Sequence, residues 1–272
     1  MKLVFRNILL LKIAFLMITC QAQKPARTDT QGQDPSPAGS DVEVKKEIFS
    51  VEYIMGKFDP ANHPDFTAIP AKYRDEEVRY LRKDVLAAFI RMYDAAAKDG
   101  IKLKIKSATR NFENQKRIWE NKWTGKTILE DNTNAAKDIK DEVARAKKIL
   151  EYSSMPGTSR HHWGTDMDFN NFTNEWFASG EGLKLYKWLQ QHAHTYGFCQ
   201  PYTRIGSDRQ SGYFEEKWHW TYVPVSTAIT AQIKSSILNS MVEGFLGAET
   251  ATKIDVVSAY MLSISPTCKF PE

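Results

Sequence analysis

The segment that decides the fold reads Thr158-Ser159-Arg160-His161-His162-Trp163-Gly164-Thr165-Asp166-Met167-Asp168-Phe169. Further along the chain lies a second segment of the same character, Glu215-Glu216-Lys217-Trp218-His219-Trp220. Together they hold three of the six histidines of the chain, and four carboxylates. A catalytic zinc ion usually takes three such side chains as ligands and leaves its fourth position to water. The pattern therefore indicates a metal site, although packed histidines beside surface carboxylates would give the same residues.

Alternation along a strand suggests how these side chains point. Asp166 and Asp168 lie two residues apart, so on a strand they face the same side. Glu216 and His219 would face opposite sides of one extended strand, which indicates that the strand begins near Trp218 and that Glu216 lies in the preceding turn. A carboxylate held there, beside the metal, can accept a proton from the attacking water. The residues alone do not decide between neighbouring candidates such as His161 and His162.

The rest of the domain reads as helices mixed with a few short strands. Helical periodicity predicts helices over 80–97, 112–123, 137–152 and 182–196, with further helices in the last forty or so residues. Alternating or aromatic runs predict strands over 101–105 and 217–223. Because the two kinds of element do not alternate strictly, the expected class is α+β.

The first part of the chain has the features of an export signal over residues 1–22. Lys2 and Arg6 precede an apolar run that is too short to span a bilayer comfortably. Cys20 lies where a lipoprotein cysteine would lie, so both a lipid anchor and simple cleavage stay open, with a buried N-terminal helix as the alternative. Residues 23–44 are polar and read as a flexible tether, and 45–272 form the single expected folded domain. The expected location is outside the cytoplasm, in the periplasm or cell envelope.

Composition narrows the choice of partners and compartment. The 272 residues carry a formal net charge of +4, and Lys and Arg are scattered, so no basic stripe predicts nucleic-acid binding. No second stretch is apolar enough to predict a transmembrane domain. Without the leader, Cys199 and Cys268 are an even pair, either a disulfide or two separate buried thiols.

Three motifs resemble one family in order and spacing. Ser159-x-His161-x-x-Gly164-x-x-x-Asp168, followed by Glu216-x-Trp218-His219, is similar to the signature of VanY-type D-alanyl-D-alanine carboxypeptidases. These belong to a wider group of zinc peptidases that includes the VanX-type dipeptidases and the Hedgehog-like fold. Upstream, Ser107-Ala108-Thr109-Arg110-Asn111-Phe112-x-x-Gln115 resembles the family's substrate-site segment, and Tyr80 to Ile101 resembles the helix and strand before it. The resemblance spans roughly Val51 to Val225.

The resemblance implies a single Hedgehog/DD-peptidase-like domain whose small antiparallel sheet, flanked by helices, carries the zinc site. It implies Zn²⁺ ligands His161, Asp168 and His219, with Glu216 as the general base. Arg110 would be a second catalytic residue, which binds or polarises the substrate near the scissile carbonyl or the terminal carboxylate. Gln115 and Ser159 would assist it in binding the substrate. The implied activity is hydrolysis of the C-terminal D-alanine of peptidoglycan stem peptides. An L,D-carboxypeptidase, a dipeptidase, an endopeptidase or a non-catalytic wall-binding module are the alternatives.

Two residues beside the implied ligands depart from the family pattern or compete with it. Asp166 occupies a position where the family often has a small residue. It could orient His161 or His219 from behind, bind a substrate amine, or compete as a ligand. His162 would then lie behind the ligands or at the rim. Thr109 stands where an aromatic residue is common, and Arg110 could instead cap a helix or pair with Glu113.

Overall fold

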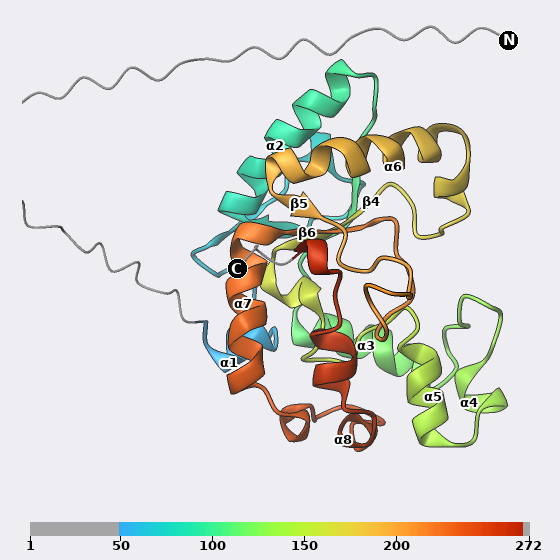
Figure 1. The fold of residues 1–272 in the computed structure, drawn as a ribbon. Helices are drawn as coiled ribbons and strands as arrows, with labels where there is room; N and C mark the ends of the chain where they lie inside the picture. The colour runs from blue at the N-terminus through green and yellow to red at the C-terminus, as the bar shows by residue number, and fades with distance from the viewer. Residues whose placement is uncertain (1–48, 269–272) are drawn as a thin grey trace, which may run out of the picture. The chain divides into compact units, whose positions relative to one another are not determined.

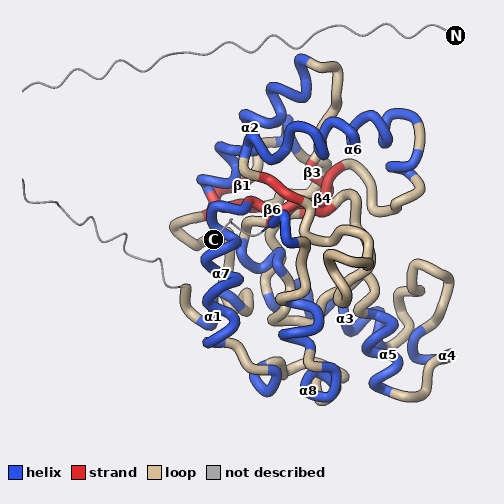
Figure 2. Tube along the Cα trace, in the orientation of Figure 1, coloured by secondary structure: helices blue, strands red, loops and turns tan. Residues whose placement is uncertain are grey.

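A four-stranded antiparallel sheet, in the order β3-β4-β6-β5, lies at the centre of the fold (Figures 1 and 2). The structure is a computed structural model that describes residues 49–268, so the predicted export signal, the tether and Cys20 lie outside the described residues. The strands are β3 (Ile105–Ser107), β4 (Asp166–Phe169), β5 (Phe198–Cys199) and β6 (His219–Tyr222). A separate antiparallel pair joins β1 (Phe66–Ala68) to β2 (Tyr80–Arg82).

Helices lie on both sides of this sheet (Figure 1). Those before β4 are α1 (Val51–Ile54), α2 (Lys83–Lys98), α3 (Phe112–Trp123), α4 (Ala135–Asp138) and α5 (Glu142–Ile149). Those after it are α6 (Gly180–His192), α7 (Val223–Ser236) and α8 (Thr250–Ile254). The α+β class with a small antiparallel sheet is thus confirmed.

Two apolar cores follow from the alternation of side chains along the central strands. Met167 of β4 lies opposite Trp220 of β6, and both are buried in a core shared with α2 and α6. In this core the rings of Phe89 and Phe169 stack, with centroids 5.7 Å apart. The other helices form a second core, around residues such as Trp119 and Ile229. Asp166 and Asp168, the neighbours of Met167 along β4, consequently face away from α2 and α6.

Local signals predicted some helix boundaries well. α3 has the predicted bounds, because Asn111 caps it by accepting a hydrogen bond from the amide of Asn114. The predicted 182–196 helix appears as α6 followed by a 3₁₀ turn at Ala193–Tyr196. The C-terminal region is helical only in part, with long loops between α7 and α8.

Three elements differ from the prediction. Tyr80–Arg82 is strand rather than the start of a helix, because these residues pair with β1. The strand expected over 101–105 lies later, at β3, where its residues can pair with β4. The helix expected over 137–152 is divided into α4 and α5, because Asp141 has extended backbone and starts a new helix by accepting from the amide of Ala144.

A disulfide joins Cys199 of β5 to Cys268, with the two Cα atoms 5.5 Å apart. It decides the alternative that the sequence left open and ties the C-terminal segment to the edge of the sheet. Within residues 49–268, none of the helices has the length and apolar character needed to cross a membrane.

Candidate metal centre

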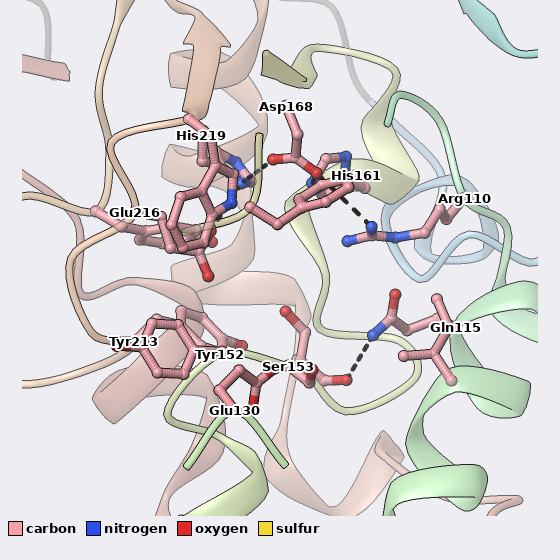
Figure 3. Close-up of a pocket in the computed structure, with 15 residues that line it drawn as sticks. Arg110, Gln115, Glu130, Tyr152, Ser153, His161, Asp168, Tyr213, Glu216 and His219 are labelled. Atoms are coloured by element: carbon pink, nitrogen blue, oxygen red, sulfur yellow. Dashed lines mark hydrogen bonds and ion pairs between the residues drawn. The ribbon is translucent and has the colours of Figure 1, made fainter. Parts of the chain in front are cut away.

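Three side chains that can bind a metal ion come from different elements and converge on one point (Figure 3). His161 comes from a 3₁₀ turn at Arg160–Trp163, Asp168 from β4 and His219 from the start of β6. Asp168 and His219 are direct partners in the sheet. One ligand atom from each of the three residues lies within 4.8 Å of the others, and all three side chains are buried. The structure therefore brings together the three residues that the family resemblance implied as ligands.

The backbone before β4 fixes the position of His161. The hydroxyl of Ser159 accepts a hydrogen bond from the amide of His161 at 3.3 Å and caps the 3₁₀ turn. Gly164 then ends the turn with a φ of 71°, a conformation that favours glycine. A Cβ on Gly164 would also come within 2.4 Å of the ring of Phe66. This glycine is what allows the chain to pass directly from His161 into β4.

The orientation of the His161 ring is set by a backbone carbonyl. Its Nδ1 lies 2.9 Å from the carbonyl oxygen of Ala108, which can only accept, so Nδ1 donates. Nε2 then faces Oδ2 of Asp168 at 3.2 Å. Burial and, next, the positive charge of Arg110 lower the pKa of His161 to about 4. Its Nε2 therefore carries a lone pair toward a carboxylate.

The ring of His219 is surrounded by carboxylates. Its Nε2 lies 2.8 Å from Oδ1 of Asp166, and its Nδ1 lies 3.2 Å from both Oδ1 of Asp168 and Oε2 of Glu216. Burial disfavours the charged ring, but these carboxylates outweigh burial and raise the pKa of His219 well above its ordinary value. The Nδ1 position thus attracts positive charge.

These residues fit a metal ion. Oδ1 of Asp168 is buried and makes no hydrogen bond within the described residues. Nε2 of His161 and Nδ1 of His219 face the same carboxylate. A metal cation among them, in place of the proton that the carboxylates favour on His219, satisfies all three groups. Two histidines and one carboxylate are also a ligand set that catalytic zinc sites use.

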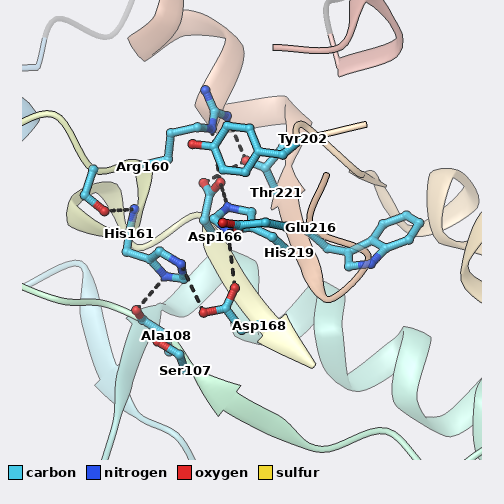
Figure 4. Close-up of polar contacts among 12 residues, drawn as sticks. Ser107, Ala108, Arg160, His161, Asp166, Asp168, Tyr202, Glu216, His219 and Thr221 are labelled. Atoms are coloured by element: carbon cyan, nitrogen blue, oxygen red, sulfur yellow. Dashed lines mark hydrogen bonds and ion pairs between the residues drawn. The ribbon is translucent and has the colours of Figure 1, made fainter. Parts of the chain in front are cut away.

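Asp166 lies behind His219, where the buried network in Figure 4 holds it. Its carboxylate accepts from Nε of Arg160 at 3.1 Å and from the hydroxyls of Thr165 and Thr221 at 2.5 and 2.7 Å. Asp166 is fully buried and is not part of the cavity wall. Of the roles considered from the sequence, its contacts match orientation of His219. Arg160 and Thr221 were not predicted from the sequence. The signal for Arg160 was Asp166 itself, because a buried carboxylate requires a nearby cation.

Glu216 lies in the turn before β6, as the alternation of residues predicted, although the strand begins at His219. Its backbone amide donates to the carbonyl of Tyr202 at 3.0 Å, and its own carbonyl accepts from Nε2 of Gln200 at 3.2 Å. The side chain is buried and lines the cavity beside the ligand atoms. Burial raises the pKa of Glu216. The carboxylate is therefore held next to the candidate metal position.

Arg110 lies on the other side of the cavity (Figure 3). Its Nη1 donates to the hydroxyl of Ser107 at 2.9 Å and lies 3.8 Å from Oδ2 of Asp168. The side chain is 25% exposed, enough to present the guanidinium to a ligand. The backbone carbonyl of Arg110 accepts from Nδ1 of His162 at 2.6 Å, while Nε2 of His162 accepts from the amide of Gly157 at 3.0 Å. Both nitrogens of His162 are thus occupied, and His162 holds the Arg110 backbone.

Gln115 and Ser159 were both expected to contact the substrate, but of the two only Gln115 lines the cavity. Gln115 is buried in the cavity wall, where its Nε2 donates to the carbonyl of Ser154 at 2.8 Å. Its Oε1 is buried as well and makes no hydrogen bond within the described residues. Ser159 is buried outside the cavity wall, because its hydroxyl caps the turn that carries His161.

Aromatic residues that the sequence analysis did not assign to the site form much of the remaining wall. The ring of Tyr202 packs against that of His219, with centroids 4.7 Å apart. The others are Tyr152, Phe172, Tyr213 and Trp218. Trp218 lies inside the second motif, and Phe172 and Tyr213 lie close to a motif, but no local pattern shows which aromatic side chains face the cavity.

Comparison with known proteins gives a consistent family. The family model of VanY, described as D-alanyl-D-alanine carboxypeptidase, matches residues 78–225, more than half of the chain. The Bacillus subtilis protein YodJ, which carries the name of a carboxypeptidase, is 32% identical over 57% of this chain and 50% of its own length. A D-alanyl-D-alanine carboxypeptidase of Enterococcus faecalis is 29% identical over 59% of this chain and 56% of its own. The chain spans about half the length of the curated relatives it matches.

Solved structures resemble the chain more distantly. The LD-carboxypeptidase LdcB is 24% identical with a TM-score of 0.47, over 72% of this chain and 79% of that chain. The vancomycin resistance D,D-pentapeptidase VanY in complex with Zn(II) is 23% identical with a TM-score of 0.42, over 68% of this chain and 93% of that one. On the family match, which covers the three candidate ligands, Glu216 and Arg110, the chain belongs to the VanY family of D-alanyl-D-alanine carboxypeptidases.

Proposed function

We propose that this protein is a zinc-dependent D-alanyl-D-alanine carboxypeptidase that hydrolyses the C-terminal residue of peptidoglycan stem peptides. The observation that supports it best is the position of Glu216. Its carboxylate lies beside the His161, Asp168 and His219 cluster in one cavity, with Oε2 3.2 Å from Nδ1 of His219. A metal site without such a carboxylate would lack a proton acceptor.

His161 Nε2, His219 Nδ1 and the Asp168 carboxylate are the proposed ligands. Zinc held by them would supply a Lewis acid for the scissile carbonyl and would lower the pKa of the attacking water. Glu216 would accept the proton of that water and deliver it to the leaving amine. The fixed position of its backbone between Tyr202 and Gln200 keeps the carboxylate at the cavity.

Arg110 is the proposed anchor of the substrate's terminal carboxylate. A guanidinium offers two parallel donors to a carboxylate, which a lysine does not. Ser107 and the backbone contact from His162 fix its position, and Gln115, in the same cavity wall, would contact the peptide. Asp166 would keep His219 in the tautomer that presents Nδ1 to the metal.

The proposed substrate also fits the predicted location. Peptidoglycan lies outside the cytoplasm, which agrees with an export signal at residues 1–22. The disulfide between Cys199 and Cys268 is of a kind that persists in an oxidising compartment. The mass of the mature protein tests the leader, because cleavage and lipid attachment at Cys20 give different masses.

Release of D-alanine from a synthetic stem pentapeptide, with and without a chelator, tests the proposal. Release that stops with chelator and returns with zinc supports it, whereas no release from the zinc-loaded protein would overturn it. A stem tetrapeptide assayed in parallel distinguishes a D,D-carboxypeptidase from an L,D-carboxypeptidase. The L,D-carboxypeptidase would cleave the tetrapeptide and leave the pentapeptide intact.

A further inference from the structure

Four aromatic rings form a continuous row that leads out of the metal-site cavity. The rings of Phe172 and Trp218 meet edge to face with centroids 6.5 Å apart, and Trp218 stacks on Tyr152 at 6.3 Å. Tyr152 in turn meets Phe214 edge to face at 5.6 Å. We call these four residues the aromatic wall. It is assembled from loops and strand ends that are far apart in the sequence.

The aromatic wall connects the metal-site cavity to its neighbours. Tyr152, Phe172 and Trp218 line both the metal-site cavity and an adjoining cavity, which Phe214 also lines. Phe172 lines a third cavity as well, on the side of Arg110. It therefore stands at the mouth of the site, where the three cavities meet.

Phe172 is exposed on a loop that is fixed at both ends. Before it, Asn170 donates from Nδ2 to the carbonyl of Lys102 at 2.7 Å. After it, Asn174 donates from Nδ2 to the carbonyl of Glu215 at 2.7 Å, and its Oδ1 accepts from the amide of Lys217 at 3.2 Å. Oδ1 of Asn171 accepts from the amide of Phe172 itself at 2.8 Å. Phe172 is nevertheless 47% exposed, as is expected of a residue that contacts a ligand.

Charge gives the direction in which a peptide would lie. Arg110 supplies positive charge at one side of the metal-site cavity. The adjoining cavity along the aromatic wall has four carboxylates and a single lysine, namely Glu130, Asp131, Glu151, Glu175 and Lys148. A peptide whose terminal carboxylate contacts Arg110 would extend its preceding residues toward the aromatic wall, since that side disfavours a carboxylate.

We infer that the aromatic wall binds the part of the peptide substrate that precedes the cleaved residue, and that Phe172 determines selectivity for long peptides over short ones. The inference rests on the proposed function, because it takes the occupant to be the peptide of that reaction. An aromatic ring covers aliphatic side chains and peptide planes of the substrate with little loss of conformational entropy.

Phe172→Ala in the full-length, zinc-loaded protein tests this role with two substrates that differ in length. For a stem pentapeptide we expect kcat/KM to fall about tenfold, mainly through a higher KM. For N-acetyl-D-alanyl-D-alanine, which does not reach along the wall, we expect a change of less than twofold. Phe172→Tyr should restore the preference for the long substrate. Leu238→Ala is a matched control, because Leu238 is 63% exposed and lines none of these cavities.

Equal losses on both peptides, or no loss on either, would overturn the inference. Binding of the pentapeptide to zinc-loaded Glu216→Gln protein, measured by calorimetry with and without Phe172→Ala, separates this outcome from failure of the proposed function. If the wild type cleaves no D-alanine terminus, the proposed function fails. A tenfold weaker binding with Phe172→Ala would still support the aromatic wall, and unchanged binding would overturn it.

Discussion

Oδ1 of Asp166 accepts a hydrogen bond from Nε2 of His219 at 2.8 Å, on the opposite nitrogen from the one that faces Asp168. This contact follows from the register of the sheet. Asp166 pairs with Thr221, which lies two residues beyond His219, so Asp166 and His219 lie on the same face of the sheet. Arg160, which is fully buried, balances the charge of Asp166 at 3.1 Å. A position where the family often has a small residue therefore carries a carboxylate that orients a candidate metal ligand.

We predict that Asp166→Asn weakens zinc binding. An amide lacks the charge that polarises His219, and removal of such a partner typically costs about 10–100-fold in metal affinity. Competition with a chromogenic chelator measures the dissociation constant. Thr221→Val removes one donor to Asp166 but keeps the carboxylate, so it should change affinity less. Equal affinity of wild type and Asp166→Asn would contradict the role of Asp166.

Replacement of Glu216 by Gln should separate metal binding from hydrolysis. The side chain keeps its size but no longer accepts a proton, so we expect kcat to fall by about 10²–10⁴-fold. Because Glu216 is outside the proposed ligand set, one zinc ion per chain should still be found by elemental analysis. Retained turnover would rule out Glu216 as the general base, and loss of zinc would indicate that it is a ligand.

The two adjacent histidines should respond differently to alanine. His161→Ala removes a proposed ligand, so the purified protein should contain little zinc. His162→Ala should keep its zinc, since both ring nitrogens of His162 bind backbone groups of Arg110 and Gly157. It should instead lower the free energy of unfolding by about 2–3 kcal/mol, because a buried donor and acceptor lose their partner and a cavity is left. Zinc content and urea denaturation distinguish the two; the reverse pattern would exchange their roles.

The disulfide should contribute measurably to stability. Cys199 and Cys268 are separated by 69 residues, so the bond closes a long loop in the unfolded chain. We expect Cys199→Ser with Cys268→Ser to lower the free energy of unfolding by about 2–4 kcal/mol. Reduction of the wild type before denaturation should give a similar loss and should not affect the double variant. A wild type that is insensitive to reductant would show that the bond does not form.

Short-range signals predicted part of this structure. Asn111 caps α3 within its own turn, and the alternation of residues around His219 correctly placed Glu216 before the strand. Contacts between distant segments were not visible in the pattern. Tyr80–Arg82 became a strand because β1 pairs with it, which overrides helical periodicity.

The same limit applies to the site. The residues of each motif could be predicted because they lie close together within that motif and resemble a family pattern. No role was predicted for Arg160 beside His161, and the fold shows that it is buried against Asp166. Phe172 and Tyr152 reach the cavity through packing of loops whose paths no local pattern specifies.

The pairing register between β4 and β6 determines which parts of the sequence can vary without a change in the positions of Asp168 and His219. Asp168 and His219 are neighbours because their strands pair, so the distance between them does not depend on the length of the segment that joins them. That segment includes α6 and the loop of Phe172. Insertions or exchanges there can reshape the mouth of the cavity while the ligand geometry is preserved, whereas a slip of one residue in the pairing would turn His219 to the opposite face.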